Sequence, residues 1–302
     1  MKKKNRRKHY GWQTLNADVR EISKKFWDDE PFQKAAAMSY YTLLSLAPLI
    51  LVVIGVAGLI FGRDAVAGRL VYEIQGLIGT DGGKVIQAIV KHASEPGKGW
   101  ASVIIGVGTL LFGSSTVFVQ LQQALNQIWG VKSDPKRNAI WSFLRERLLS
   151  LAMVLGIGFL LLVSLVLSAA LSAINALYSS FLSTSPVVLE IIHVVISVGV
   201  IAVLFAMIFK FLPDAEISWN NVWFGSLLTA VLFTLGKFLI GLYLGRVTLG
   251  SAFGAAGSIV VLMVWAYYAS IILFFGAEVT EFWAKKRGTP IEPSEHAIKS
   301  KS

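Results

Sequence analysis

Long apolar runs separated by short polar segments make up most of this chain. A helix that rises about 1.5 Å per residue needs about 20 apolar residues to cross roughly 30 Å of hydrocarbon. Six runs reach that length, at residues 35–61, 101–128, 148–178, 187–211, 222–243 and 258–283. The pattern therefore predicts an all-α fold, a polytopic membrane bundle of six transmembrane helices.

Two of the remaining segments have patterns of their own. Residues 12–34 repeat apolar residues at helical spacing among charged ones, which predicts an amphipathic interfacial helix, although a simple lead-in to the first span fits as well. Residues 62–100 carry two apolar stripes, which predict a short external helical hairpin. We therefore divide the chain into a basic N-terminus at 1–34, a six-span membrane domain at 35–283 and a basic tail at 284–302.

The basic residues are placed unevenly along the chain, whose net charge is +10. With the N-terminus inside, the cytoplasmic segments hold 21 of the 28 Lys and Arg residues, and the opposite side holds only six. Such a bias sets membrane orientation and predicts that both termini are cytoplasmic. Because the charge follows the loops rather than one face, we expect membrane lipids as partners and no nucleic acid.

Polar side chains inside the first two spans are candidates to line a cavity. Tyr41 and Ser45 precede Pro48, which frees a backbone carbonyl and favours a kink. Gln122 and Asn126 are four residues apart and so lie on one helical face. Two ordinary interpretations stay open, namely close packing around a tolerated proline and amides that have already reached the cytoplasmic interface.

Ionisable residues inside spans are costly and are often functional. Lys237 lies deep in the fifth span and Glu278 lies in the sixth. Counting residues places Lys237 nearest in depth to Glu190 and His193, so a pair between Lys237 and Glu190 is one hypothesis. The alternatives are that Lys237 extends its ammonium group to the interface, and that Glu278 only marks the cytoplasmic end of its helix.

Signatures of enzymes are missing from the sequence. There is no cysteine, the four histidines are scattered, and neither a phosphate-binding loop nor a hydrolase nucleophile elbow occurs. We therefore expect no catalytic residues, no metal site and no cofactor.

Four segments resemble the YihY/BrkB family of bacterial inner-membrane proteins, historically labelled ribonuclease BN-like. They are AAAMSYYTLLSLAPLI, FGSSTVFVQLQQALNQIWGV, PDAEISWNNVWFGSLLTA and GSAFGAAGSIVVLMVWAYYASIILFFGAEVTEFWA. The resemblance covers nearly all of residues 15–285 and implies a six-span fold in the bacterial inner membrane. Members are also described as virulence or serum-resistance factors. The histidine and aspartate clusters of a metal-dependent ribonuclease are lacking here, so the ribonuclease label is not carried over.

Three functional hypotheses follow from these patterns. The leading one is non-enzymatic transport or accommodation of a lipid or small solute through a polar cavity in the bundle. The second is an envelope-organising membrane scaffold whose hairpin and basic ends bind partners. The third, an intramembrane or lipid-modifying enzyme, needs a close pair of acidic or histidine groups at one depth, which the sequence does not show. A homo-oligomer is compatible with all three.

Overall fold

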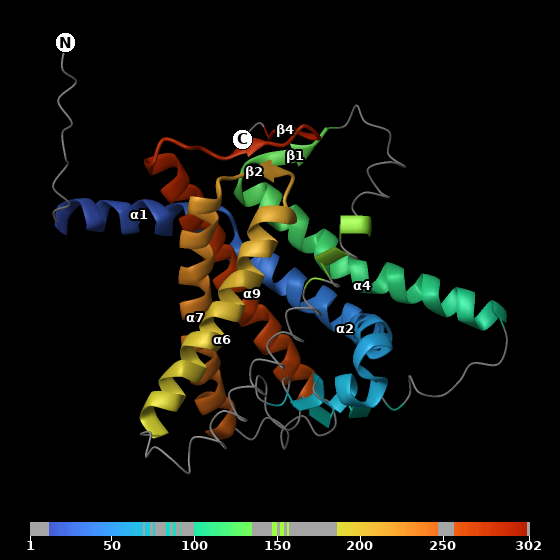
Figure 1. Ribbon diagram of the computed structural model, residues 1–302. Coiled ribbons are helices and arrows are strands. Elements are labelled where there is room, and N and C mark those ends of the chain that lie inside the picture. The colour runs from blue at the N-terminus through green and yellow to red at the C-terminus, as the bar shows by residue number, and fades with distance from the viewer. Residues whose placement is uncertain are drawn as a thin grey trace.

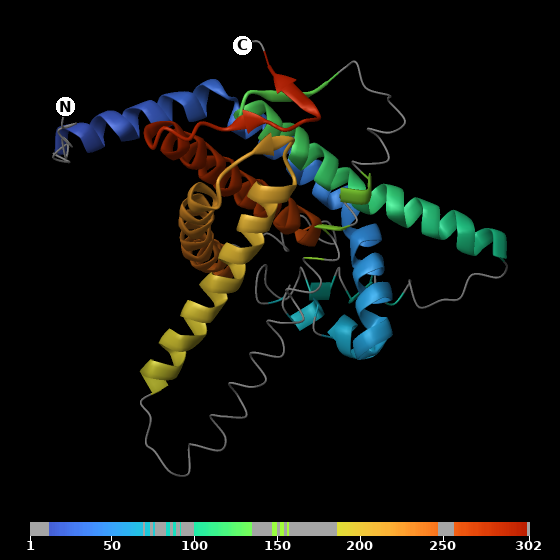
Figure 2. The ribbon, with the colours of Figure 1, turned by 45° about the horizontal axis from the view of Figure 1, so that its top comes forward.

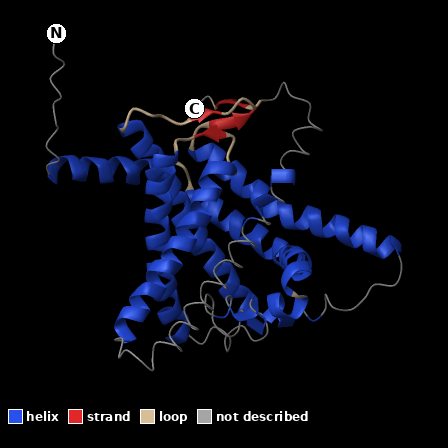
Figure 3. Cartoon of the chain, viewed as in Figure 1, coloured by secondary structure: helices blue, strands red, loops and turns tan. Residues whose placement is uncertain are grey.

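The computed structural model describes most of the chain, namely residues 12–68, scattered residues between 70 and 91, and residues 100–134, 147–149, 152, 153, 156, 186–246 and 257–300. Helices dominate these residues (Figures 1 and 3). Six long helices are described: α1 (Trp12–Asp28), α2 (Pro31–Phe61), α4 (Trp100–Ile128), α6 (Pro186–Phe211), α7 (Trp219–Arg246) and α9 (Gly257–Lys286).

Five of these helices correspond to predicted spans, and their ends differ from the predicted limits by at most four residues. Four stretches of the described residues are long and apolar enough to cross a membrane, at Pro31–Gly55, Val194–Phe211, Trp219–Ile240 and Ile259–Lys286. These findings confirm an all-α membrane bundle. The third predicted span at 148–178 and the external hairpin lie mostly outside the described residues, so the count of six spans stays a prediction.

Helix α9 holds the middle of the bundle. It packs against α2 on one side and α7 on the other, while α4 packs against α2 and α6 packs against α7 (Figure 1). Helices α4 and α6 run close together at one end and diverge toward the other (Figure 2). Large apolar side chains of α6 and α7 are exposed along the diverging part, which is expected of a surface that faces lipid: Val194, Val195, Leu235, Phe238 and Leu239.

Reciprocal glycine contacts bring α7 and α9 close together. A β-carbon at Gly225 would collide with Thr280, and one at Gly276 would collide with Thr229. Each threonine hydroxyl also donates a hydrogen bond to the glycine carbonyl one turn back in its own helix, at 2.7 Å for Thr229 and 2.6 Å for Thr280. Small residues at membrane helix interfaces allow this approach.

Four short strands form a cap over one end of the bundle, which we call the strand cap (Figure 3). Strand β1 (Val131–Ser133) pairs antiparallel with β4 (Ala297–Lys299), and β2 (Ala215–Glu216) pairs antiparallel with β3 (Glu292–Pro293). The C-terminal segment therefore joins the loop after α4 to the loop after α6. The largest fully buried apolar side chains lie close to this cap: Leu125, Phe209, Leu212 and Phe274.

Exposed aromatic residues gather at the same end of the molecule. Trp27 ends α1, Trp219 and Trp223 begin α7, and Phe211 ends α6, and all four are exposed. Tryptophan is enriched at membrane–water interfaces, where its ring is apolar and its N–H stays wet. Exposed aromatic rings at this end are what a membrane surface would favour, and the interfacial position of α1 stays a prediction.

A tight elbow connects α1 to α2. Glu30 adopts the left-handed conformation, with φ of 50° and ψ of 50°, and Pro31 then starts α2 in the position where a helix needs no backbone N–H. Helix α2 bends about halfway along its length (Figure 2), and Pro48 stands near the middle of its sequence. A proline removes one helical hydrogen bond, which accounts for a bend of this kind.

Candidate functional site

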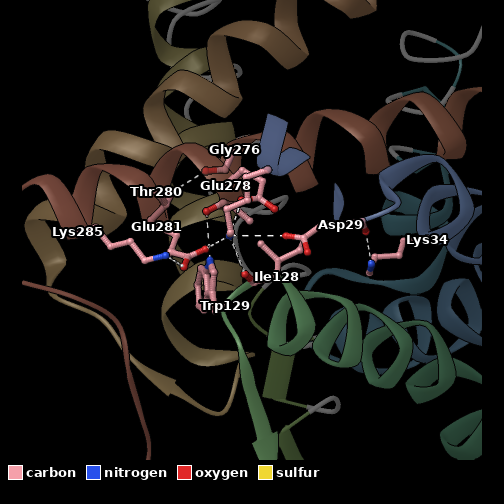
Figure 4. A network of polar contacts seen from close by, with 11 residues as sticks. Asp29, Lys34, Ile128, Trp129, Gly276, Glu278, Thr280, Glu281 and Lys285 are labelled. Atoms are coloured by element: carbon pink, nitrogen blue, oxygen red, sulfur yellow. Dashed lines mark hydrogen bonds and ion pairs between the residues drawn. The ribbon is translucent and has the colours of Figure 1, made fainter. Parts of the chain in front are cut away.

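Glu278 lies at the centre of a charged cluster where α1 meets α9 (Figure 4). The ammonium group of Lys25 donates a hydrogen bond of 2.8 Å to Glu278 Oε2 and also contacts the Glu281 carboxylate. The same ammonium lies 3.6 Å from Asp29 Oδ2 and donates to the carbonyl of Ile128 at 3.1 Å. One lysine of the interfacial helix therefore joins three acidic side chains and the end of α4.

Burial makes these contacts strong. The Glu278 side chain is 1% exposed and that of Glu281 is 8% exposed, whereas Lys25 keeps 35% of its side chain in contact with solvent. Burial alone would lower the pKa of Lys25, but the neighbouring carboxylates of Glu278 and Glu281 more than offset it and raise that pKa above its ordinary value. Lys25 is therefore a fixed positive charge at physiological pH.

Two oxygens of the cluster lack a hydrogen-bond donor among the described residues. They are Glu278 Oε1 and Asp29 Oδ2, and both are buried. Both carboxyl groups contact the same Lys25 ammonium, Glu278 at 2.8 Å and Asp29 at 3.6 Å, so they lie next to each other around it (Figure 4). Two acidic side chains thus lie side by side, each with a buried oxygen that has no donor among the described residues.

Further contacts hold α1 against the bundle. Lys286 of α9 pairs with Asp18 of α1, and the ring of Phe26 packs edge-on against Phe275 at 5.6 Å. Beside these contacts, the indole N–H of Trp129 donates to the carbonyl of Ala277 at 3.2 Å and joins the end of α4 to α9. Helix α1 is therefore docked on α9 by both ion pairs and aromatic packing.

Asn126 has a different role from Glu278. Its amide nitrogen donates to Asp214 Oδ2 at 3.0 Å, and its amide oxygen accepts the backbone N–H of Asp214 at 2.8 Å. Ser133 also donates to this carboxylate, at 3.1 Å. Asn126 thus ties α4 to the turn after α6 beneath the strand cap, and its polar atoms are satisfied by the protein itself.

Ser45 and Gln122 are buried in the pair formed by α2 and α4. Ser45 is 1% exposed and Gln122 is 3% exposed. The hydroxyl oxygen of Ser45 and the amide nitrogen of Gln122 have no hydrogen-bond partner among the described residues. A β-carbon at Gly113 would collide with Pro48, which fixes where the two helices meet. Ser45 is about one turn from this crossing and Gln122 about 13 Å further along α4.

The other two predicted residues are less buried. Tyr41 is half-buried and stacks edge-on with Tyr40 at 5.6 Å, and Lys237 is half-buried on α7. The suggested partner Glu190 and its neighbour His193 lie outside the residues whose side chains are described. That all six predicted residues line a cavity stays a prediction.

Sequence reasoning missed the partner of Glu278. It treated the N-terminal helix and the sixth span separately, so Lys25 and Asp29 were not considered with it. A signal was present, because Lys25 and Asp29 are four residues apart in a helix, as are Glu281 and Lys285. Among the residues that the structure describes, no group of three or more His, Cys, Asp or Glu has an arrangement that holds a metal ion.

Comparison with known proteins shows which family the chain belongs to. The family described as Virulence factor BrkB matches residues 22–300. A UPF0761 membrane protein of Verminephrobacter eiseniae is 28% identical over 280 residues, which cover 90% of this chain and 63% of the relative. A UPF0761 membrane protein of Rhodospirillum centenum is 27% identical over 265 residues, covering 87% and 56%. The chain thus spans about three fifths of the length of these two relatives.

A further relative has a different name and a similar length. The putative ribonuclease-like protein YfkH of Bacillus subtilis is 23% identical over 283 residues, which cover 92% of this chain and 99% of that protein. No solved structure matches the chain. The match over most of the chain, together with helices long enough to span a membrane, shows that the chain is a membrane protein of the Virulence factor BrkB family.

Proposed function

We propose that this protein moves or accommodates a lipid or a small solute within its helix bundle, in the bacterial cytoplasmic membrane, without catalysing a reaction on it. One observation carries the proposal: Ser45 and Gln122, on two apolar helices that pack together, hold buried polar atoms without a partner among the described residues. In a membrane, a polar group without a hydrogen bond costs about 1–3 kcal/mol or more. A bound headgroup or polar solute would supply the missing partners.

Native mass spectrometry of the protein, extracted gently from its own membrane, tests this function. The comparison is between the wild type, Gln122→Leu, and Gln123→Leu as the matched control, because Gln123 is exposed on the same helix. We expect a stoichiometric lipid or solute on the wild type and on the control. Gln122→Leu should lose it, since leucine cannot donate a hydrogen bond.

Two results would count against the proposal. One is a wild-type protein that carries no such molecule, and the other is a folded Gln122→Leu protein that carries as much as the control. Either would favour the scaffold, whose partners would bind the external hairpin and the basic ends instead. A reconstituted assay for transfer of a fluorescent lipid between leaflets then separates movement from mere binding.

A further inference from the structure

The cluster around Glu278 has more acidic groups than basic ones (Figure 4). Its acidic members are Asp29, Glu278 and Glu281. Lys25 contacts all three, and Lys285 pairs with Glu281 at 2.6 Å. With every carboxyl group ionised, three negative charges face two positive ones. One uncompensated negative charge in a largely buried place is costly.

The hydrogen bonds show where this imbalance lies. Glu281 has a basic partner for each oxygen, since Oε2 faces Lys25 and Oε1 faces Lys285. Glu278 has a donor only at Oε2, and its buried Oε1 has none among the described residues. The buried Oδ2 of Asp29 has no hydrogen-bond donor either, although the Lys25 ammonium is 3.6 Å away. The missing proton donor therefore belongs between Asp29 and Glu278.

Among the described residues, the surrounding elements place no other cation within ion-pair distance of these two carboxyl groups. From α2, Lys34 reaches the backbone carbonyl of Asp29 rather than its carboxyl group. At the end of α4, the Ile128 carbonyl accepts from Lys25 and the Trp129 indole donates to the Ala277 carbonyl, and both groups are uncharged. Within the described part of the chain, Lys25 is the one cation within ion-pair distance of Glu278.

We propose that the neighbouring carboxyl groups of Asp29 and Glu278 form a proton-binding site and hold one proton between them. The proton comes from the solvent, and no other bond is made or broken. Two carboxyl groups at close range commonly share one proton, because both cannot be ionised there at low cost. With this proton the cluster has no net charge, and each buried oxygen that lacked a donor gains a hydrogen bond.

This site goes beyond the proposed function, because it does not depend on whether the bundle moves a molecule. It lies where the interfacial helix docks, so proton occupancy is linked to the contact between α1 and α9.

Infrared spectroscopy of the full-length protein in lipid vesicles tests the site directly, since a protonated carboxyl group has a C=O stretching band separate from carboxylate bands. We expect this band at neutral pH in the wild type. Glu278→Gln and Asp29→Asn should each lose one protonated carboxyl group per chain, because either variant is neutral without a bound proton. Asp28→Asn, at an exposed neighbouring position, should keep it.

Three results would overturn the proposal: no such band in the wild type, a band unchanged in a folded Asp29→Asn protein, or equal loss in Asp28→Asn. The Asp29→Asn variant keeps the test decisive if Glu278→Gln does not fold, because Asp29 is 30% exposed and lies just after the end of α1. Lipid or solute binding is measured separately, so a failure here is distinct from a failure of the proposed function.

Discussion

Among the residues of the cluster at Glu278, replacing Lys25 should reduce the stability of the protein most. Lys25→Met keeps the side-chain length and removes the ammonium group, which leaves buried acidic groups uncompensated. We expect the free energy of unfolding to fall by about 2 kcal/mol, less than the 3–5 kcal/mol of a wholly buried pair because the lysine is partly exposed. Unfolding in mild detergent measures this, with the exposed neighbour Lys24→Met as control. Equal loss in both variants would contradict the assignment.

The pKa of Lys25 also predicts how that stability changes with pH. A group whose pKa is raised by folding stabilises the fold fully below its unfolded value, here 10.5, and loses this contribution as the pH rises through the folded value. The difference in unfolding free energy between the wild type and Lys25→Met should therefore stay constant from neutral pH to about pH 10 and shrink above it. A difference that already vanishes near pH 8 would show that Lys25 is not held by carboxylates.

Asn126 tests a second buried contact. Asn126→Leu removes two hydrogen bonds to Asp214, a residue that is 2% exposed. Hydrogen bonds to buried charged groups contribute about 1.5–3 kcal/mol, so we expect a loss of that size. The exposed neighbour Gln127→Leu is the control. If chemical unfolding gives the two variants the same stability, Asn126 does not tie α4 to the turn after α6.

At the scale of single residues, the sequence identified several buried polar residues but not the residues that they contact. Glu278 and Asn126 were recognised because an acid or an amide in an apolar run needs a partner. Their partners lie about 250 and 90 positions away. Contacts over such separations depend on which helices become neighbours, and hydropathy does not encode that.

Among the helices, the contact between α7 and α9 is the most sensitive to side-chain size. Gly225→Ala adds a single methyl group that would collide with Thr280. Overpacking of this kind costs about 1–3 kcal/mol. Gly199→Ala in α6 is the control, because nothing lies within contact of the added methyl group and alanine favours a helix. Thermal unfolding should separate the two variants, and equal midpoints would contradict the close contact.

Helices were easier to predict than strands, and easier than which helices pack together. A run of 20 apolar residues leaves little choice of structure in a membrane, which is why the predicted spans and the observed helices agree closely. Strands of two or three residues carry no readable alternation, so the strand cap was missed and the tail was described only as basic. The sequence also did not show that α9 lies at the centre of the bundle, because every span has a similar composition.

For the molecule as a whole, the strand cap makes a prediction about sidedness. Helix α1 and strand β4 lie at the same end, so Lys24 and Lys299 should face the same compartment, which the charge bias predicts to be the cytoplasm. The chain has no cysteine, so Lys24→Cys and Lys299→Cys each give a single reactive thiol. A maleimide that cannot cross membranes should label both in inverted vesicles and neither in intact cells. Labelling in intact cells, or of only one position, would contradict this arrangement.

The position of α9 in the chain has a consequence for how the protein is made. Among the described helices, the one that joins the α2–α4 pair to the α6–α7 pair comes last in the chain, and β3 and β4, which close the cap, follow it. Until translation reaches α9, neither pair can make its contacts with that helix. Assembly of the bundle is thus a late event, and a ribosome that stops before residue 257 leaves a product that the membrane's quality-control proteases should remove.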